Sequence, residues 1–187
     1  MAVPAHAGDV RLRIVDGTGA PVRDAVVTIH TARPAAAGSF KFPWAAAMTQ
    51  RNVQFDPHVL IIPVGAVVTF PNFDKVRHHV YSFSKAAKFE IKLFGRDESR
   101  SYTFKTAGAV AIGCNIHDAM TGFIKVVDTP YANKTAGDGA TVIASVPAGR
   151  TRITVWHPRM RAKDQESTLD LDVTAGDLSK LITVSLK

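Results

Sequence analysis

Apolar and polar side chains alternate along much of this chain, a pattern typical of strands that bury one face. The alternation is clear in residues 10–14 (VRLRI), 169–173 (LDLDV) and 182–186 (ITVSL). Residues 25–29 (AVVTI) form a more continuous β-branched run, and the glycines and proline of residues 16–21 (DGTGAP) predict a turn before it. No convincing amphipathic helix interrupts these runs. The pattern therefore predicts an all-β fold.

Strand signals continue through the middle of the chain. Residues 52–70 contain two β-rich runs that flank a Pro-Val-Gly turn, and residues 88–93 alternate charged with apolar side chains. Apolar runs at residues 109–113 and 122–127 predict two further strands. Residues 35–44, before these runs, are rich in alanine and carry three aromatic side chains. We interpret this segment as a linker whose aromatics pack between domains.

Length and charge narrow the classes of protein that need to be considered. A chain of 187 residues is long enough for one large or two small domains. No stretch approaches the roughly 20 apolar residues of a transmembrane helix, so no membrane span is predicted. The net charge of +7 predicts attraction to acidic partners. Basic and acidic residues are interleaved, however, and no basic stripe or zinc-finger spacing indicates nucleic acid.

A cysteine, a histidine and a methionine directly follow the apolar run at residues 109–113. Cys114, His117 and Met120 have the spacing C-x-x-H-x-x-M. With a second imidazole, they would complete a blue-copper site, in which two histidines and a thiolate lie in one plane and a methionine binds weakly on the axis. His78 and His79 can supply that imidazole.

Two alternatives to a copper site remain open. Cys114 alone would often be a buried structural residue, because a free cysteine packs as a small hydrophobe. Zinc would also accept this ligand set.

The chain has a single cysteine, which excludes an internal disulfide and a binuclear copper site built on two thiolates. One mononuclear copper site is therefore expected. No nucleophile–base pair, paired carboxylates or phosphate-binding glycine loop emerges from the sequence. Four protein ligands would leave no open position for a substrate on the metal. We therefore expect an electron carrier and not an enzyme.

The middle of the chain resembles the cupredoxin (blue copper) family. Residues 55–72 match the pattern F-x-P-x-x-L-x-I-x-x-G-x-x-V-x-F-x-N that cupredoxins carry ahead of their first copper-binding histidine. The short C-x-x-H-x-x-M loop is most like that of amicyanin, and residues 77–80 (RHHV) stand where plastocyanin and amicyanin have Pro-His-Asn-Val. The resemblance implies that residues 45–128 form a Greek-key β-sandwich.

The same resemblance implies the roles of the site residues. His78 and His117 would be the imidazole ligands, Cys114 the thiolate and Met120 the axial ligand. His79 stands where blue-copper proteins usually have an asparagine that braces the ligand loop. We expect His79 and Asn115 to contact the ligands and not the metal. Adjacent strand residues point to opposite faces, so His78 and His79 should not bind the same ion; the alignment favours His78.

The two ends of the chain resemble a second β-sandwich that is split in the sequence. Residues 16–27 (DGTGAPVRDAVV) are similar to the first hairpin of carboxypeptidase-regulatory-like domains, which have transthyretin-like or Ig-like folds. The usual continuation of that hairpin is found only at residues 135–155, which include V-P-A-G. We therefore predict that residues 9–34 and 130–187 form one sandwich and that the cupredoxin domain is inserted into it.

The order of both parts is similar to periplasmic plastocyanin-like proteins of the methylamine utilization type. Ala5-His6-Ala7 has the A-x-A form of a signal-peptide cleavage site, and we expect an exported, periplasmic protein. Its expected function is the transfer of single electrons between redox partners. One partner would be an acidic protein of the cytochrome c or dehydrogenase type. Copper storage, delivery or sensing is the alternative.

Overall fold

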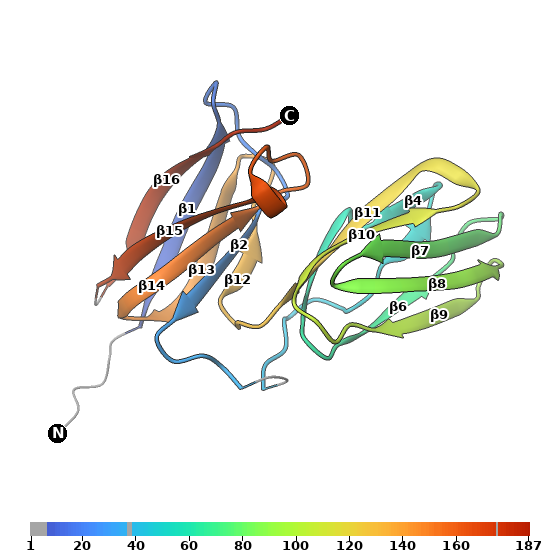
Figure 1. The fold of residues 1–187 in the computed structure, drawn as a ribbon, viewed down its shortest axis with the longest axis horizontal. Helices are drawn as coiled ribbons and strands as arrows, with labels where there is room; N and C mark the ends of the chain where they lie inside the picture. The colour runs from blue at the N-terminus through green and yellow to red at the C-terminus, as the bar shows by residue number, and fades with distance from the viewer. Residues whose placement is uncertain (1–6, 37–38, 175) are drawn as a thin grey trace. The chain divides into compact units, whose positions relative to one another are not determined.

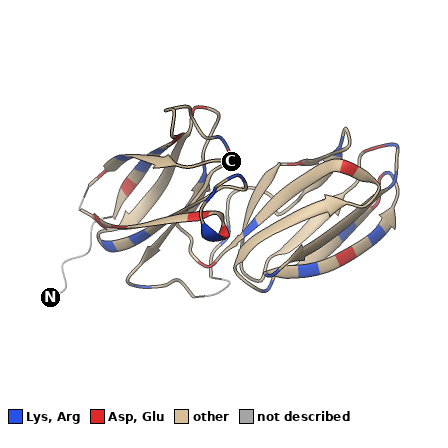
Figure 2. Cartoon of the chain, turned by 45° about the horizontal axis from the view of Figure 1, so that its top comes forward, with Lys and Arg blue, Asp and Glu red and all other residues tan. Residues whose placement is uncertain are grey.

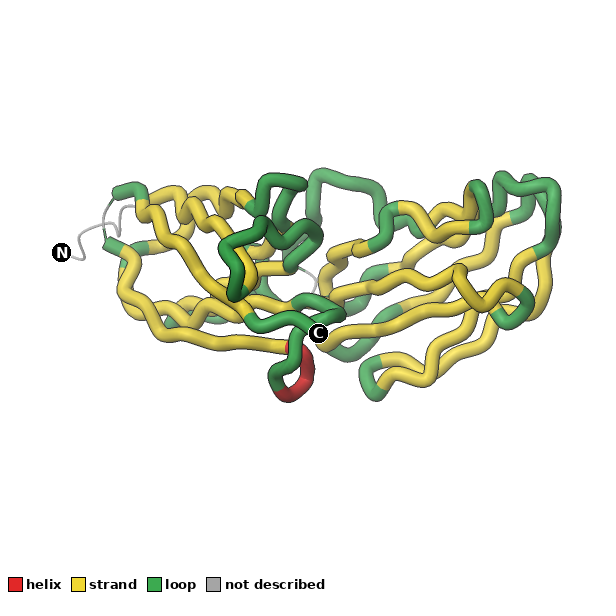
Figure 3. The backbone as a smooth tube through the Cα atoms, turned by 90° about the horizontal axis from the view of Figure 1, so that it is seen from above, coloured by secondary structure: helices red, strands yellow, loops and turns green. Residues whose placement is uncertain are grey.

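The structure is a computed structural model that describes residues 7–36, 39–174 and 176–187. Ala5 and His6 of the candidate cleavage site lie outside the described residues. Strands run through both parts of the chain in Figure 3, and the prediction of an all-β fold is confirmed. Among the described residues, no helix has the length and apolar character needed to cross a membrane.

The chain divides into two compact units. The first unit combines the residues up to Pro34 with Tyr131–Lys187, and the second comprises Ala35–Pro130. Both ends of the chain therefore contribute to one unit, and the middle forms the other. That the units fold independently stays a prediction.

Unit 1 contains two β-sheets (Figure 1). The three-stranded sheet has the order β13 (Ala140–Pro147), β1 (Ala7–Asp16) and β16 (Leu178–Val184). The four-stranded sheet has the order β12 (Ala132–Lys134), β2 (Val26–Thr31), β14 (Gly149–Trp156) and β15 (Glu166–Val173). A short 3-10 segment, η1 (Lys163–Gln165), precedes β15. All of these pairs are antiparallel except β1 with β16, which is parallel.

The core of unit 1 follows from the alternation in its sequence. Val10, Leu12 and Ile14 are buried on β1, while Arg11 and Arg13 between them are exposed. Their neighbours in the apolar core come from both ends of the chain and include Ile29, Ile143, Ile153, Val155, Val173 and Val184. The two ends of the sequence therefore share one apolar core.

Unit 2 has a five-stranded sheet with two smaller ones beside it. The order of the large sheet is β5 (Val59–Pro63), β11 (His117–Val127), β10 (Gly108–Cys114), β7 (His78–Ser84) and β8 (Ala87–Phe94). β5 pairs with β11 in parallel, and the remaining pairs of this sheet are antiparallel. The smaller sheets pair β6 (Val67–Pro71) with β9 (Ser99–Thr103) and β3 (Thr49–Arg51) with β4 (Gln54–Asp56).

Aromatic residues fill much of the core of unit 2. Phe70, Phe94 and Phe104 are fully buried, and Phe89 stacks on Tyr102 with ring centroids 4.2 Å apart. The same apolar cluster contains two site residues from the sequence analysis, Cys114 and Met120. A large, rigid core of this kind holds the ends of the strands at fixed positions.

Part of the predicted linker packs on unit 2. Phe42 stacks on Trp44 with ring centroids 4.7 Å apart, and the Trp44 indole Nε1–H donates to the carbonyl oxygen of Ile61 on β5 at 2.8 Å. β5 lies at the end of its sheet, so the indole satisfies a carbonyl that no strand of that sheet pairs. At least the Trp44 end of residues 35–44 is therefore attached to unit 2.

Charged residues are spread over both units, with acidic residues between basic ones (Figure 2). This distribution agrees with the interleaving in the sequence. The net charge of +7 is accordingly not concentrated in one basic stripe along the chain.

Candidate metal centre

Three of the predicted ligands lie at the ends of neighbouring strands. Cys114 ends β10 and His117 begins β11, and the two residues pair across a tight turn made of Asn115 and Ile116. β7 is the other neighbour of β10, and His78 is its first residue. The hairpin and the adjacent strand therefore bring His78 to Cys114, although 36 positions separate them in the sequence.

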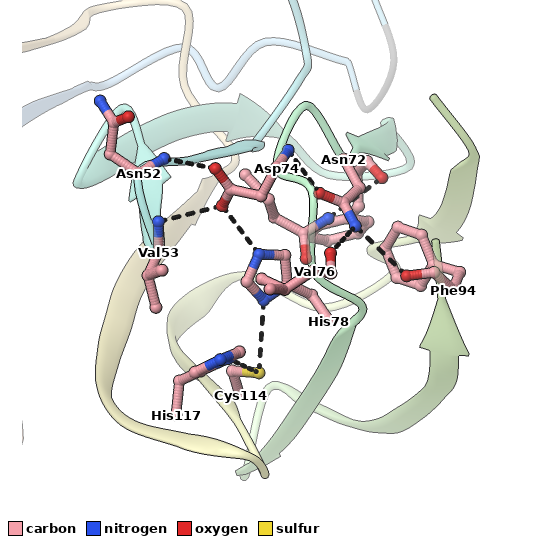
Figure 4. A network of polar contacts seen from close by, with 11 residues as sticks. Asn52, Val53, Asn72, Asp74, Val76, His78, Phe94, Cys114 and His117 are labelled. Atoms are coloured by element: carbon pink, nitrogen blue, oxygen red, sulfur yellow. Dashed lines mark hydrogen bonds and ion pairs between the residues drawn. The ribbon is translucent and has the colours of Figure 1, made fainter. Parts of the chain in front are cut away.

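The side chains of these residues converge on the cysteine sulfur (Figure 4). Cys114 Sγ lies 3.5 Å from His117 Nδ1 and 3.8 Å from His78 Nδ1. The donor atoms of the three residues all lie within 4.8 Å of one another. His78 and Cys114 are buried, and His117 is half-buried. Both imidazoles thus present the same ring nitrogen to the sulfur.

The chemistry of this cluster fits a soft transition metal. A thiolate and two neutral imidazoles are ligands that copper and zinc both accept, and the burial of the site excludes most water. A metal binds the thiolate form of cysteine and the neutral form of histidine, and the Cys114 sulfur lies close to the Nδ1 atoms of both imidazoles. The residues present therefore suit a mononuclear site.

Asp74 orients His78. Its Oδ2 lies 2.8 Å from His78 Nε2, at the side of the ring opposite the cysteine (Figure 4). A carboxylate accepts a hydrogen bond from Nε2–H, which leaves Nδ1 with the free electron pair that a metal needs. The sequence analysis missed Asp74. Its signal was an aspartate at the end of the Pro-Asn-Phe-Asp turn, four residues before His78.

The Asp74 carboxylate is itself held by backbone donors. The N–H groups of Asn52 and Val53 donate to it at 2.6 and 2.9 Å. Asn52 and Val53 have φ of 55° and 56°, a left-handed conformation that is rare for a β-branched residue. This turn between β3 and β4 aims two N–H groups at one carboxylate. A rarely adopted backbone conformation of this kind is often found where a functional group must be positioned.

Burial and hydrogen bonding act in opposite directions on Asp74. Desolvation by burial would raise the pKa of this carboxyl group, but the hydrogen bonds from Val53, His78 and Asn52 lower the pKa below its ordinary value. The net effect favours the ionised carboxylate, the form that accepts a hydrogen bond from His78.

Asn72 fixes the loop that carries Asp74. Its side chain is fully buried and donates to the carbonyl oxygens of Val76 and Phe94 at 2.9 and 3.2 Å. Its Oδ1 accepts a hydrogen bond from the Asp74 backbone N–H at 2.9 Å. One amide therefore ties the loop before β7 to the end of β8 (Figure 4).

His79 lies outside the cluster. Its Nε2 is 2.9 Å from Glu90 Oε1 on β8, and its ring packs beside Tyr81. The buried Nδ1 of His79 has no hydrogen-bond partner among the described residues. This arrangement agrees with the argument that adjacent strand residues face opposite sides, but the partner of His79 is a carboxylate on β8 and not a residue of the ligand loop.

Met120 and Asn115, the two remaining site residues, differ from each other in burial. Met120 on β11 is buried and belongs to the same apolar cluster as Cys114. Its role as an axial ligand stays a prediction. Asn115 is exposed in the turn between Cys114 and His117.

Fold and site together define an all-β protein whose middle unit carries a His-Cys-His cluster with the donor atoms of a metal site. No family model matches the chain, and no curated protein matches it. Several solved structures match part of the chain. The reduced Cu(I) form, at pH 4, of a mutant amicyanin is 24% identical, with 54% of this chain and 98% of that chain covered and a TM-score of 0.42.

Two further solved structures widen the comparison. The Cu-containing nitrite reductase (NirK) of Thermus scotoductus SA-01 is 30% identical over 51% of this chain and 25% of that chain, with a TM-score of 0.42. A purple cupredoxin from Nitrosopumilus maritimus is 24% identical over 43% of this chain and 96% of that chain, with a TM-score of 0.39. The structural neighbours are thus amicyanin and other copper proteins.

Proposed function

We propose that this protein is a type 1 copper protein that carries single electrons between redox partners in the periplasm. The observation that supports it best is the placing of the Cys114 sulfur between the Nδ1 atoms of His78 and His117. Copper bound by such a set supplies a one-electron Cu(I)/Cu(II) couple with a strong thiolate bond. His78, Cys114 and His117 would hold the metal, and Met120 would be a weak axial ligand.

The residues around the cluster would keep its geometry nearly unchanged during electron transfer. Asp74 holds the ring of His78, and the buried core packs around Cys114. His117 is half-buried and follows Ile116, which is 50% exposed. This ring is therefore the proposed exit for electrons, because an apolar rim is easily desolvated when a partner docks.

The experiment is the visible absorption spectrum of the copper-loaded full chain, followed by voltammetry. We expect an intense thiolate-to-copper charge-transfer band and a reversible one-electron couple. Cys114→Ser should abolish the band, since a hydroxyl cannot replace the thiolate donor. His30→Gln, a histidine change in unit 1, should leave the spectrum unchanged. A copper-loaded protein without this band would contradict the proposal.

Copper storage or delivery is the competing function. A half-buried histidine ligand gives a chelator a point of access, whereas a closed four-ligand set retains its metal. Rapid loss of copper to a chelator, without a reversible couple, would favour delivery over electron transfer. Retention of copper through many redox cycles would favour the carrier.

Periplasmic location and membership of the methylamine utilization type are also part of this proposal. Their support is the sequence: the A-x-A form of residues 5–7 and the order of the two resembling parts. Mass spectrometry of the natively produced protein tests export, because a mature chain that starts near Ala7 is expected after cleavage. Co-purification with redox proteins from periplasmic extract would address the partner.

A further inference from the structure

Three aromatic side chains form a row on one face of β7. His79, Tyr81 and Phe83 alternate along the strand, with ring centroids 5.8 Å apart for the first pair and 5.3 Å for the second. Exposure rises along the row, from 7% at His79 to 80% at Phe83. The row therefore begins next to the ligand His78 and ends on the surface.

The middle ring of the row touches the backbone beside the cysteine ligand. Tyr81 pairs with Gly113 across β7 and β10. A Cβ atom added at Gly113 would lie 3.1 Å from Tyr81 Cζ and from its Oη, so the ring is packed against the bare backbone of this glycine. Gly113 directly precedes Cys114. A short path, first through space and then along the backbone, thus leads from Tyr81 to the thiolate.

The surface around the exposed end of the row is basic. Lys88 on β8 pairs with Phe83 and therefore shares its face, and Lys85 lies in the turn between the two strands. Both lysines are exposed and, with Lys105, line an open hollow of about 650 Å³. An acid on this face, Glu90, is bonded to His79. Phe83 is thus a large apolar side chain set among cations.

We propose that this face, formed by Tyr81, Phe83, Lys85 and Lys88, is the docking surface for an acidic redox protein. The inference rests on the proposed copper function and adds an entry point separate from the exit at His117. Covering Phe83 would bury apolar area that this chain leaves in water, and the lysines would attract carboxylates on the partner. One electron would leave the reduced partner and reach the centre through Tyr81, Gly113 and Cys114, with no proton transferred and no bond made or broken.

Binding at the docking surface can be measured without electron transfer. The probe is the hexacyanochromate(III) anion, whose paramagnetism broadens the amide signals of nearby residues in an NMR spectrum of the full chain loaded with Cu(I). We expect broadening at Phe83, Lys85 and Lys88. The double variant Lys85→Glu/Lys88→Glu should lose it, whereas Lys163→Glu/Lys180→Glu, the same charge change on unit 1, should keep it. Broadening centred on residues 115–119, or unchanged by the first double variant, would overturn the docking surface.

The electron path is tested by stopped-flow reduction of the Cu(II) form. With hexacyanoferrate(II) as reductant at low salt, Lys85→Glu/Lys88→Glu should slow reduction by about tenfold or more, and the cationic reductant hexaammineruthenium(II) should show no such loss. Tyr81→Leu should slow reduction by hexacyanoferrate(II) while the reduction potential and the anion-induced broadening stay unchanged. Tyr81→Phe, which keeps the ring, should restore the rate.

The outcomes separate this inference from the proposed function. Absence of the thiolate band in copper-loaded wild-type protein would refute the copper function itself. A normal band with a Tyr81→Leu rate equal to that of wild type would refute the path through Tyr81 and leave the copper function standing.

Discussion

Met120 is the site residue whose role depends most on its chemistry. It is buried in the apolar cluster that also contains Cys114. A thioether on the axis of a type 1 site binds weakly and tunes the potential. Met120→Leu should therefore keep the charge-transfer band and change the reduction potential, since leucine fills a similar volume without a donor. Voltammetry checks this, and complete loss of copper would show that Met120 is a principal ligand.

Asp74 gives a sharper prediction, because its carboxylate directly orients the ring of His78. Asp74→Asn should weaken metal affinity by about 10- to 100-fold, the usual cost of losing a carboxylate partner behind a histidine ligand. Competition with a chelator of known affinity measures the change. Asp118→Asn, the same change in charge at the exposed residue after His117, is the matched control and should have little effect.

A third prediction tests which of the neighbours His78 and His79 is the metal ligand. His78→Ala should lose copper or open the site, because it removes a donor 3.8 Å from the sulfur. His79→Ala should retain copper, since its contacts are with Glu90 and Tyr81. Copper stoichiometry after gel filtration distinguishes the two variants. Retention by His78→Ala together with loss by His79→Ala would move the ligand by one residue.

At the scale of single residues, the sequence identifies the types of the ligands but not the residues that hold the ligands in position. Cys114, His117 and Met120 are recognisable because three soft or borderline donors fall within seven positions. Asp74 could not be assigned in this way. Its contact with His78 depends on the turn at Asn52 and Val53, which is distant in sequence and places the β-branched Val53 in a left-handed conformation that such residues rarely adopt.

At the scale of strands and turns, alternation predicts most strands, but not every strand boundary or which distant strands pair. The regular alternation of β1 reflects one buried and one exposed face. Two β-rich runs that flank a Pro-Val-Gly turn are predicted within residues 52–70, and the structure divides the first run into β4 and β5 at Pro57, which has no N–H to donate. The parallel pairing of β5 with β11 is invisible in the local pattern, because register between distant strands depends on the whole core.

Gly139 allows a test of one turn in unit 1. Its φ is +76°, and an added Cβ would collide with the carbonyl oxygen of Ile14 on β1. Gly139→Ala should lower the free energy of unfolding by about 2–4 kcal/mol, from the strained φ and the overpacking together. Urea denaturation followed by fluorescence of the buried Trp156 measures it.

A second glycine in the same turn is the matched control. An added Cβ at Gly137 would have no neighbour within 4 Å, and its φ is outside the left-handed range. Gly137→Ala should therefore change stability by no more than about 0.5 kcal/mol, as for an ordinary surface substitution. Equal losses for the two variants would mean that the turn does not constrain β1 as the structure indicates.

At the scale of the whole molecule, each unit has an apolar core of its own. The core of unit 2 draws its buried members from residues 48–126, and the core of unit 1 draws its members from residues 10–29 and 143–184. β1 pairs with β13 and β16, and β2 pairs with β12 and β14, so the two end segments complete each other's sheets. The separated halves of one resemblance are the basis for expecting such a division, and the insertion of one domain into another sandwich stays a prediction.

Excision tests whether unit 2 folds independently. A fragment of residues 45–128 should fold and bind copper alone, because all of its buried core and all four predicted ligands lie within it. A fragment of residues 35–130 should be more stable, since it restores the Trp44 hydrogen bond to Ile61 and the stack on Phe42. The segments 9–34 and 130–187 should remain unfolded apart and gain structure when mixed. Circular dichroism and copper titration measure each case, and an unfolded 35–130 fragment in the presence of copper would mean that the two units depend on each other for folding.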